Sequence, residues 1–170
     1  MKNKKGFTLI ELLAVIVILA LLVAVAIPAV TKYLNTARRG TVADNAQTAI
    51  SAVRNDYISN GYTADKTYSL EYINSTLLDK KIEKSPFNNS QWNQKNSCVV
   101  VDYKPATNDS EATTTYHVCL ESTDGASGIN QDEASVVDEK VVAAGFGKTT
   151  CDSLCGGTTP ATPTTPTTGS

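Results

Sequence analysis

A run of sixteen consecutive apolar residues, Leu12–Ile27, is the feature that most constrains the fold of this chain. With the apolar residues on either side, the stretch extends over 24 residues from Phe7 to Val30. An α-helix of that size is about 36 Å long, because each residue adds about 1.5 Å. The hydrocarbon core of a bilayer is roughly 30 Å thick. The sequence therefore predicts one membrane-spanning helix close to its beginning.

The basic residues ahead of this run predict its orientation. Lys2, Lys4 and Lys5 precede the apolar stretch, and the positive-inside rule places such an end in the cytoplasm. A cleaved secretory signal peptide also begins with basic residues, but its apolar part is usually shorter and a small-residue cleavage site follows it. We therefore expect a single-pass precursor in the cytoplasmic membrane, with the later residues on the exported side.

Two residues of the apolar stretch are unusual for a simple anchor. Glu11 lies near its start, where a carboxylate costs a few kcal/mol unless it is paired or lies close to the interface. Pro28 lies near its far end, where proline removes one helical hydrogen bond and loosens the preceding turn. Both residues are therefore candidates for a function beyond anchoring.

The heptapeptide GFTLIEL at residues 6–12 follows a short basic leader and opens the apolar helix. It resembles the signal of type IV prepilins and of type II secretion pseudopilins. In that family a prepilin peptidase cuts after the glycine, on the cytoplasmic side, and methylates the new N-terminal residue. The resemblance implies cleavage between Gly6 and Phe7 and N-methylation of Phe7.

The resemblance also implies a role for Glu11 in assembly into a helical homo-oligomeric filament, built by pilus assembly machinery in the cytoplasmic membrane. In the family this glutamate is thought to meet the new N-terminal amine, here that of Phe7, on a neighbouring subunit. A buried carboxylate is tolerable when a cation pairs with it. The alternative is an unpaired Glu11 that reaches the lipid headgroups. Pro28 falls where the family often has a helix-loosening proline.

The helical pattern continues beyond Pro28 with one apolar face. That face follows helical spacing through Val42, Ala46, Ile50, Val53 and Tyr57. We expect one helix from Thr8 to Asn60, weakened at Gly40 and ended by Asn60-Gly61.

The second half of the chain carries signals for a small sheet. Residues 69–80 have the pattern of a short helix with Ser69 as its N-cap. Residues 98–103 and 113–120 are rich in β-branched and aromatic residues, and 135–144 offers a third strand. The expected fold class is α+β: a long N-terminal α-helix packed against a small antiparallel sheet, as in pilins.

All four cysteines follow the apolar run, so they lie on the expected exported side and predict two disulfides. Zinc is disfavoured because paired CxxC spacing is absent. An antiparallel pairing of the two best strands sets Cys98 opposite Cys119, with Val99 facing Val118 and Val101 facing Tyr116 on the core side. This register favours Cys98–Cys119 with Cys151–Cys155, and the two other pairings stay open.

Other polar residues give weaker signals. His117, the only histidine, falls opposite the core beside Val100, and a lone histidine on a strand is most often structural. The loop 124–133 holds four oxygen donors, for which a solvated acidic turn is favoured over a calcium site: Asp124, Asn130, Asp132 and Glu133. We expect no cofactor, no metal and no enzymatic activity. The net charge of -2 disfavours nucleic-acid binding.

The expected organisation has four parts. Residues 1–6 form a cytoplasmic leader, 7–30 the membrane and filament-core helix, and 31–155 the pilin head. Residues 156–170 form a Thr/Pro-rich tail, which should be extended. The favoured function is a type IV pilus subunit, extracellular when mature, in adhesion, motility or DNA uptake. The alternatives are a pseudopilin of a secretion or competence system and a single-pass anchored binding protein.

Overall fold

The computed structural model of the chain describes residues 8–137, 140–147 and 150–156. The chain divides into two compact units, of which the first ends at Ala37 and the second begins at Arg38. The cleavage residues Gly6 and Phe7 and most of the Thr/Pro-rich tail lie outside the described residues.

A single helix, α1 (Leu9–Ser59), runs through both units, as the hydrophobic pattern predicts. Its bounds agree with the expected 8–60 to within a residue. At the C-terminal end of α1, the Asn60 N–H still donates to the carbonyl of Asp56. The next residue, Gly61, has a positive φ of 64°. Glycine adopts that conformation without steric cost, which is why Asn60-Gly61 ends the helix.

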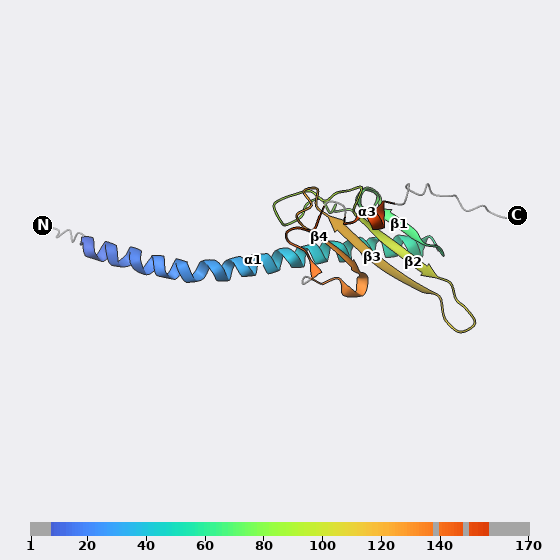
Figure 1. The fold of residues 1–170 in the computed structure, drawn as a ribbon, viewed down its shortest axis with the longest axis horizontal. Helices are drawn as coiled ribbons and strands as arrows, with labels where there is room; N and C mark the ends of the chain where they lie inside the picture. The colour runs from blue at the N-terminus through green and yellow to red at the C-terminus, as the bar shows by residue number, and fades with distance from the viewer. Residues whose placement is uncertain (1–7, 138–139, 148–149, 157–170) are drawn as a thin grey trace. The chain divides into compact units, whose positions relative to one another are not determined.

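The second unit contains a four-stranded antiparallel sheet (Figure 1). Its order is β1-β2-β3-β4, and the strands span Lys66–Ser69, Cys98–Lys104, Thr113–Glu121 and Gly128–Asp132. The predicted strands 98–103 and 113–120 are confirmed as β2 and β3. Their register is also confirmed, with Cys98 opposite Cys119, Val99 opposite Val118 and Val101 opposite Tyr116.

The predicted third strand at 135–144 is wrong. The strand beside β3 is β4, and within 135–144 only an isolated bridge from Val142 to Gly128 is described. Val136 and Val141 are buried, and their carbonyls accept hydrogen bonds from Gln47 and Arg39 of α1 at 3.2 and 2.8 Å. Val136 and Val141 therefore pack in the core cluster that includes α1, and the described part of the segment pairs with β4 only at the bridge from Val142 to Gly128.

The predicted helix at 69–80 is shorter than expected. Ser69 is its cap, accepting from the Tyr72 N–H at 3.3 Å, and the helical residues are α2 (Leu70–Tyr72) and the π-helical η1 (Ile73–Leu77). The buried Asn74 side chain then forms two hydrogen bonds with the backbone of Ile82, at 2.7 and 2.9 Å. These bonds draw the following chain back, so the helix ends before residue 80.

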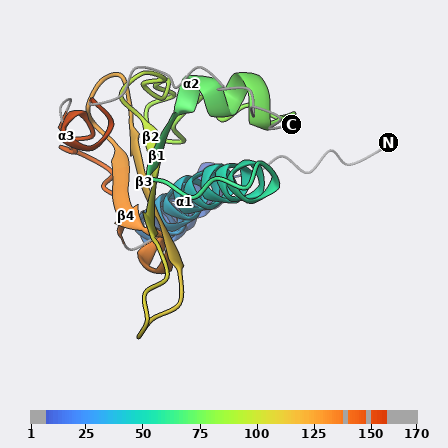
Figure 2. The same cartoon turned by 90° about the vertical axis from the view of Figure 1, so that its right-hand side faces the viewer.

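The sheet has two covered faces. The C-terminal half of α1 packs on one face and the short helix α3 (Asp152–Cys155) on the other (Figure 2). The expected core side is confirmed, since Val99, Val101, Tyr116 and Val118 are all buried in the cluster that includes α1. A smaller cluster on the opposite face contains the four cysteines with Val100, Phe146 and Leu154. The arrangement is the α+β fold that the sequence predicts.

Candidate assembly site and cystine cluster

The first turn of α1 is closed by a reciprocal cap between Thr8 and Glu11. The Thr8 N–H and hydroxyl donate to Glu11 Oε2 at 2.9 and 2.8 Å, and the Glu11 N–H donates to Thr8 Oγ1 at 3.3 Å. This is a capping box, which satisfies backbone donors that the helix itself leaves unpaired. The carboxylate of Glu11 therefore has a partner within its own chain. Sequence reasoning missed it, although the Thr-x-x-Glu spacing is a readable signal.

The first unit presents an apolar surface. All side chains of α1 from Leu9 to Leu34 are exposed. The most apolar 18-residue segment of the helix has a mean hydropathy of 3.2, and none of its residues is buried. Contiguous apolar surface of this extent is unfavourable in water and is typical of lipid-facing or protein-facing helices. The helix is long and apolar enough to cross a membrane.

Pro28 lies inside α1 without ending it. Proline has no N–H, so the carbonyl four residues earlier, that of Ala24, loses its usual helical donor. Three residues later the Thr31 hydroxyl donates to the Ile27 carbonyl at 2.7 Å, an additional bond in the same turn. The loosening effect of Pro28 stays a prediction, since the helix is continuous here.

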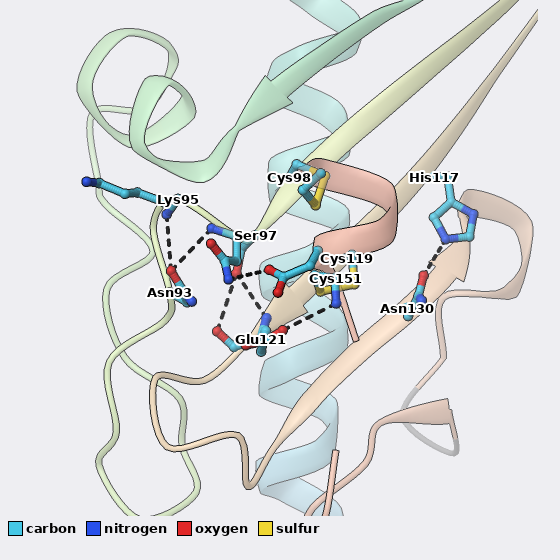
Figure 3. Close-up of a disulfide and its surroundings, with 12 residues drawn as sticks. Asn93, Lys95, Ser97, Cys98, His117, Cys119, Glu121, Asn130 and Cys151 are labelled. Carbon is cyan, nitrogen blue, oxygen red and sulfur yellow. Dashed lines mark hydrogen bonds between the residues drawn. A yellow bond between two sulfur atoms is a disulfide. The ribbon is translucent and has the colours of Figure 1, made fainter. Parts of the chain in front are cut away.

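The four cysteines form two disulfides, but the favoured pairing is wrong. Cys98 is bonded to Cys155 and Cys119 to Cys151, each with a Cα–Cα distance of 5.7 Å. Figure 3 shows α3 lying over the sheet at these bonds. The predicted opposition of Cys98 and Cys119 in the ladder is correct, yet they do not bond to each other.

The reason lies in the directions of the side chains. Two opposed cysteines on one sheet face both point away from the sheet, toward whatever covers it. Their Cβ atoms lie about 4.5–5.5 Å apart, and residues four apart on a helix are separated by about 5–6 Å. Cys151 and Cys155 have that spacing, so the covering segment meets both strand cysteines at once.

A buried carboxylate lies beside this cluster (Figure 3). Glu121 is 1% exposed, accepts from the Cys151 N–H at 3.3 Å and is hydrogen-bonded to the side chain of Asn93. Burial raises the pKa of Glu121, and the negative charge of Asp152 acts in the same direction. The bond from Cys151 opposes this shift without cancelling it. The hydrogen bond from Cys151 to Glu121 thus links residues 150–156 to the end of β3, although burial of the charged carboxylate is unfavourable.

His117 lies beside Val100 on the face away from α1, as predicted. Its Nδ1 is 2.6 Å from Asp132 Oδ1 and its Nε2 is 2.5 Å from Asn130 Oδ1, so both ring nitrogens are engaged by β4. No serine or cysteine is among these contacts. These two contacts hold the imidazole of His117 against β4.

The four oxygen donors of the loop 124–133 have partners within the protein, and Asn130 and Asp132 share His117. Asp124 accepts from the Ser122 hydroxyl at 2.6 Å, which lowers its pKa, and Glu133 forms an ion pair with Arg54. Over the described parts of the chain, no group of three histidine, cysteine, aspartate or glutamate side chains that could hold a metal ion is found.

Comparison with known proteins identifies the N-terminal signal. Residues 1–27 match the family model described as the prokaryotic N-terminal methylation motif. Two proteins of Pseudomonas aeruginosa, each described as a fimbrial protein, are 37% identical over 89 residues, which is 46% of this chain and 55% of each relative. The chain thus spans about half the length of the curated relatives that it matches. No solved structure gives a significant match.

The α+β fold with its long apolar N-terminal helix is a pilin-like arrangement, and the methylation motif lies at the start of that helix. The resemblance to type IV pilins is confirmed by the motif and by the fimbrial relatives. The chain carries the prokaryotic N-terminal methylation motif and is similar to the fimbrial proteins over 89 residues.

Proposed function

We propose that the chain is the precursor of a structural subunit of a type IV pilus. The observation that carries the proposal is the methylation motif at the start of a helix whose apolar side chains from Leu9 to Leu34 are exposed. Such a helix is stable in lipid or in a bundle of like helices, and both surroundings are apolar. Assembly then transfers the helix from the membrane to the filament core at low cost.

The proposed maturation begins with cleavage between Gly6 and Phe7 by a prepilin peptidase, followed by N-methylation of Phe7. The leader of residues 1–6 stays in the cytoplasm, residues 7–30 form the membrane and filament helix, and the head is exported. The mature subunit is extracellular in a homo-oligomeric pilus. The fimbrial relatives support a pilus over a secretion pseudopilin.

The proposed role of Glu11 is to accept the Phe7 amine of a neighbouring subunit. In the single chain its carboxylate already receives two hydrogen bonds from Thr8. These donors are neutral, so the carboxylate keeps its negative charge uncompensated until a cation arrives. A neighbour's amine supplies that cation and selects subunits in register.

The test compares three variants in cells that make the filament. Gly6→Val should block cleavage and retain a precursor that is heavier by the leader. Glu11→Gln should be cleaved normally but be depleted at least tenfold from the sheared surface fraction. Thr8→Ser, which keeps the capping hydroxyl, is the matched control and should assemble. Normal filaments from Glu11→Gln would contradict the role of the charge.

A further inference from the structure

We infer that the head matures through a thiol–disulfide exchange and that a thiol-bearing disulfide isomerase is therefore a partner of this chain. The inference rests on the proposed function in one respect, since it takes the head to be exported with its C-terminal end last. The observation behind it is that the strand cysteines Cys98 and Cys119 are direct partners in the β2–β3 ladder but are not bonded to each other.

The order of export brings the wrong pair together first. Cys98 and Cys119 emerge before Cys151, which follows Cys119 by 32 residues. A β-hairpin forms in about 1–10 μs, whereas disulfides form in seconds or longer. The β2–β3 hairpin therefore has time to set the two strand cysteines side by side, about 4.5–5.5 Å apart at Cβ, before either native partner arrives.

Loop lengths act in the same direction. Cys98 and Cys119 are 21 residues apart, while the native bonds join residues separated by 57 and 32. Loop closure becomes less probable as roughly the 3/2 power of length, which favours the non-native bond about fourfold over Cys98–Cys155 and about twofold over Cys119–Cys151. Cys151 and Cys155, one helical turn apart, are then left to bond with each other.

The native arrangement is reached from this trapped form by three exchanges that consume no oxidant. A thiolate of the partner attacks Cys98 in the Cys98–Cys119 bond and forms a mixed disulfide, which releases Cys119 as a thiolate. Cys119 attacks Cys151 in the Cys151–Cys155 bond, forms Cys119–Cys151 and releases Cys155. The Cys155 thiolate then attacks Cys98 in the mixed disulfide, forms Cys98–Cys155 and returns the partner's thiolate. Two disulfides are present at the start and two at the end.

The burial of the finished cluster favours the native form. The cysteines are 0–7% exposed and pack with Val100, Phe146 and Leu154 on the outer face of the sheet. In the trapped form no covalent bond holds residues 150–156 to the sheet. The exchange therefore favours the native pairing, because only that pairing holds residues 150–156 in the packed cluster. The same burial protects the finished bonds, because an attacking thiolate needs access.

The test is refolding of the full chain in a non-ionic detergent after complete reduction. One sample receives diamide alone and a second receives diamide followed by millimolar reduced glutathione; both are quenched with N-ethylmaleimide and mapped by mass spectrometry. With diamide alone we expect the Cys98–Cys119 bond to predominate, and with glutathione a rise of at least threefold in the native pairs. Equal native yields in both samples would overturn the inference.

Two variants make the result specific. C151A/C155A keeps only the strand cysteines, which should cross-link with diamide alone; failure to do so overturns the hairpin argument. C98A/C155A keeps only Cys119 and Cys151, which should form their native bond equally with or without glutathione. Neither variant involves cleavage or polymerisation, so failure of this inference is distinguishable from failure of the pilus proposal.

Discussion

Double cysteine-to-alanine variants distinguish the observed disulfides from the pairing that the strand register favours, because the two pairings predict different losses of stability. C98A/C155A removes the disulfide between residues 57 apart, and C119A/C151A removes the one between residues 32 apart. In the chain-entropy model each bond contributes about 3–4 kcal/mol to the free energy of unfolding, and the longer loop about 0.5 kcal/mol more.

The decisive variant is C98A/C119A. It also removes two cysteines, but one from each observed disulfide, so neither native bond forms. We expect it to lower the free energy of unfolding by about 6–8 kcal/mol, roughly twice the loss in C98A/C155A. Under the alternative pairing the order reverses, because C98A/C119A would remove one bond and C98A/C155A both.

The assay is guanidinium unfolding of the full chain in non-ionic micelles, followed by fluorescence. Trp92 is the only tryptophan, lies in the head and is 1% exposed, so its emission reports unfolding of that unit alone. Free energies rather than midpoints are compared, because cross-links change the compactness of the unfolded chain. Losses below about 1 kcal/mol in all three variants would refute the view that the disulfides stabilise the head.

Three further predictions concern single residues of the head. Gly40→Ala should raise the free energy of unfolding by about 1 kcal/mol, because a Cβ there meets nothing within 4 Å and glycine weakens a helix interior; an unchanged denaturation curve would contradict this. Gly128→Ala should lower the free energy of unfolding by about 1–3 kcal/mol in the same assay, since the new Cβ would clash with the Leu120 carbonyl and with the Phe146 ring; wild-type stability would contradict this. Glu121→Gln should raise thermal stability at pH 7, and the gain should shrink as the pH falls toward about 4.5. The pKa of Glu121 is raised in the folded protein above 4.5, its ordinary value. The protonated carboxyl therefore stabilises the folded protein below about pH 4.5, and this stability is lost as the pH rises through the folded pKa. A gain that does not change with pH would contradict the titration of Glu121.

Much of the fold is predictable because local patterns and the packing agree. Sixteen consecutive apolar residues and the stripe that follows them predict α1, and Asn60-Gly61 predicts its end. The β-branched residues of β2 and β3 predict both strands and their register, since a shift by one residue would turn Val99 and Val101 away from the core.

The remainder depends on contacts between distant segments. The segment that contains Val136 and Val141 has the β-branched composition of a strand. Hydrogen bonds from the side chains of Gln47 and Arg39 to the carbonyls of these two residues instead hold it against α1. The disulfide pairing likewise depends on α3 covering the outer sheet face, which no local pattern indicates. The Thr8–Glu11 cap is different, because its spacing was readable from the sequence.

The central claim, that the chain is processed and polymerised as a pilin, is tested most directly at its N-terminus. The measurement is intact-mass and N-terminal peptide analysis of protein sheared from the cell surface. The account predicts a chain that begins at N-methylated Phe7, lacks residues 1–6 and carries two intact disulfides. A chain that retains its leader and remains in the membrane fraction would contradict the claim and favour an anchored protein that does not assemble.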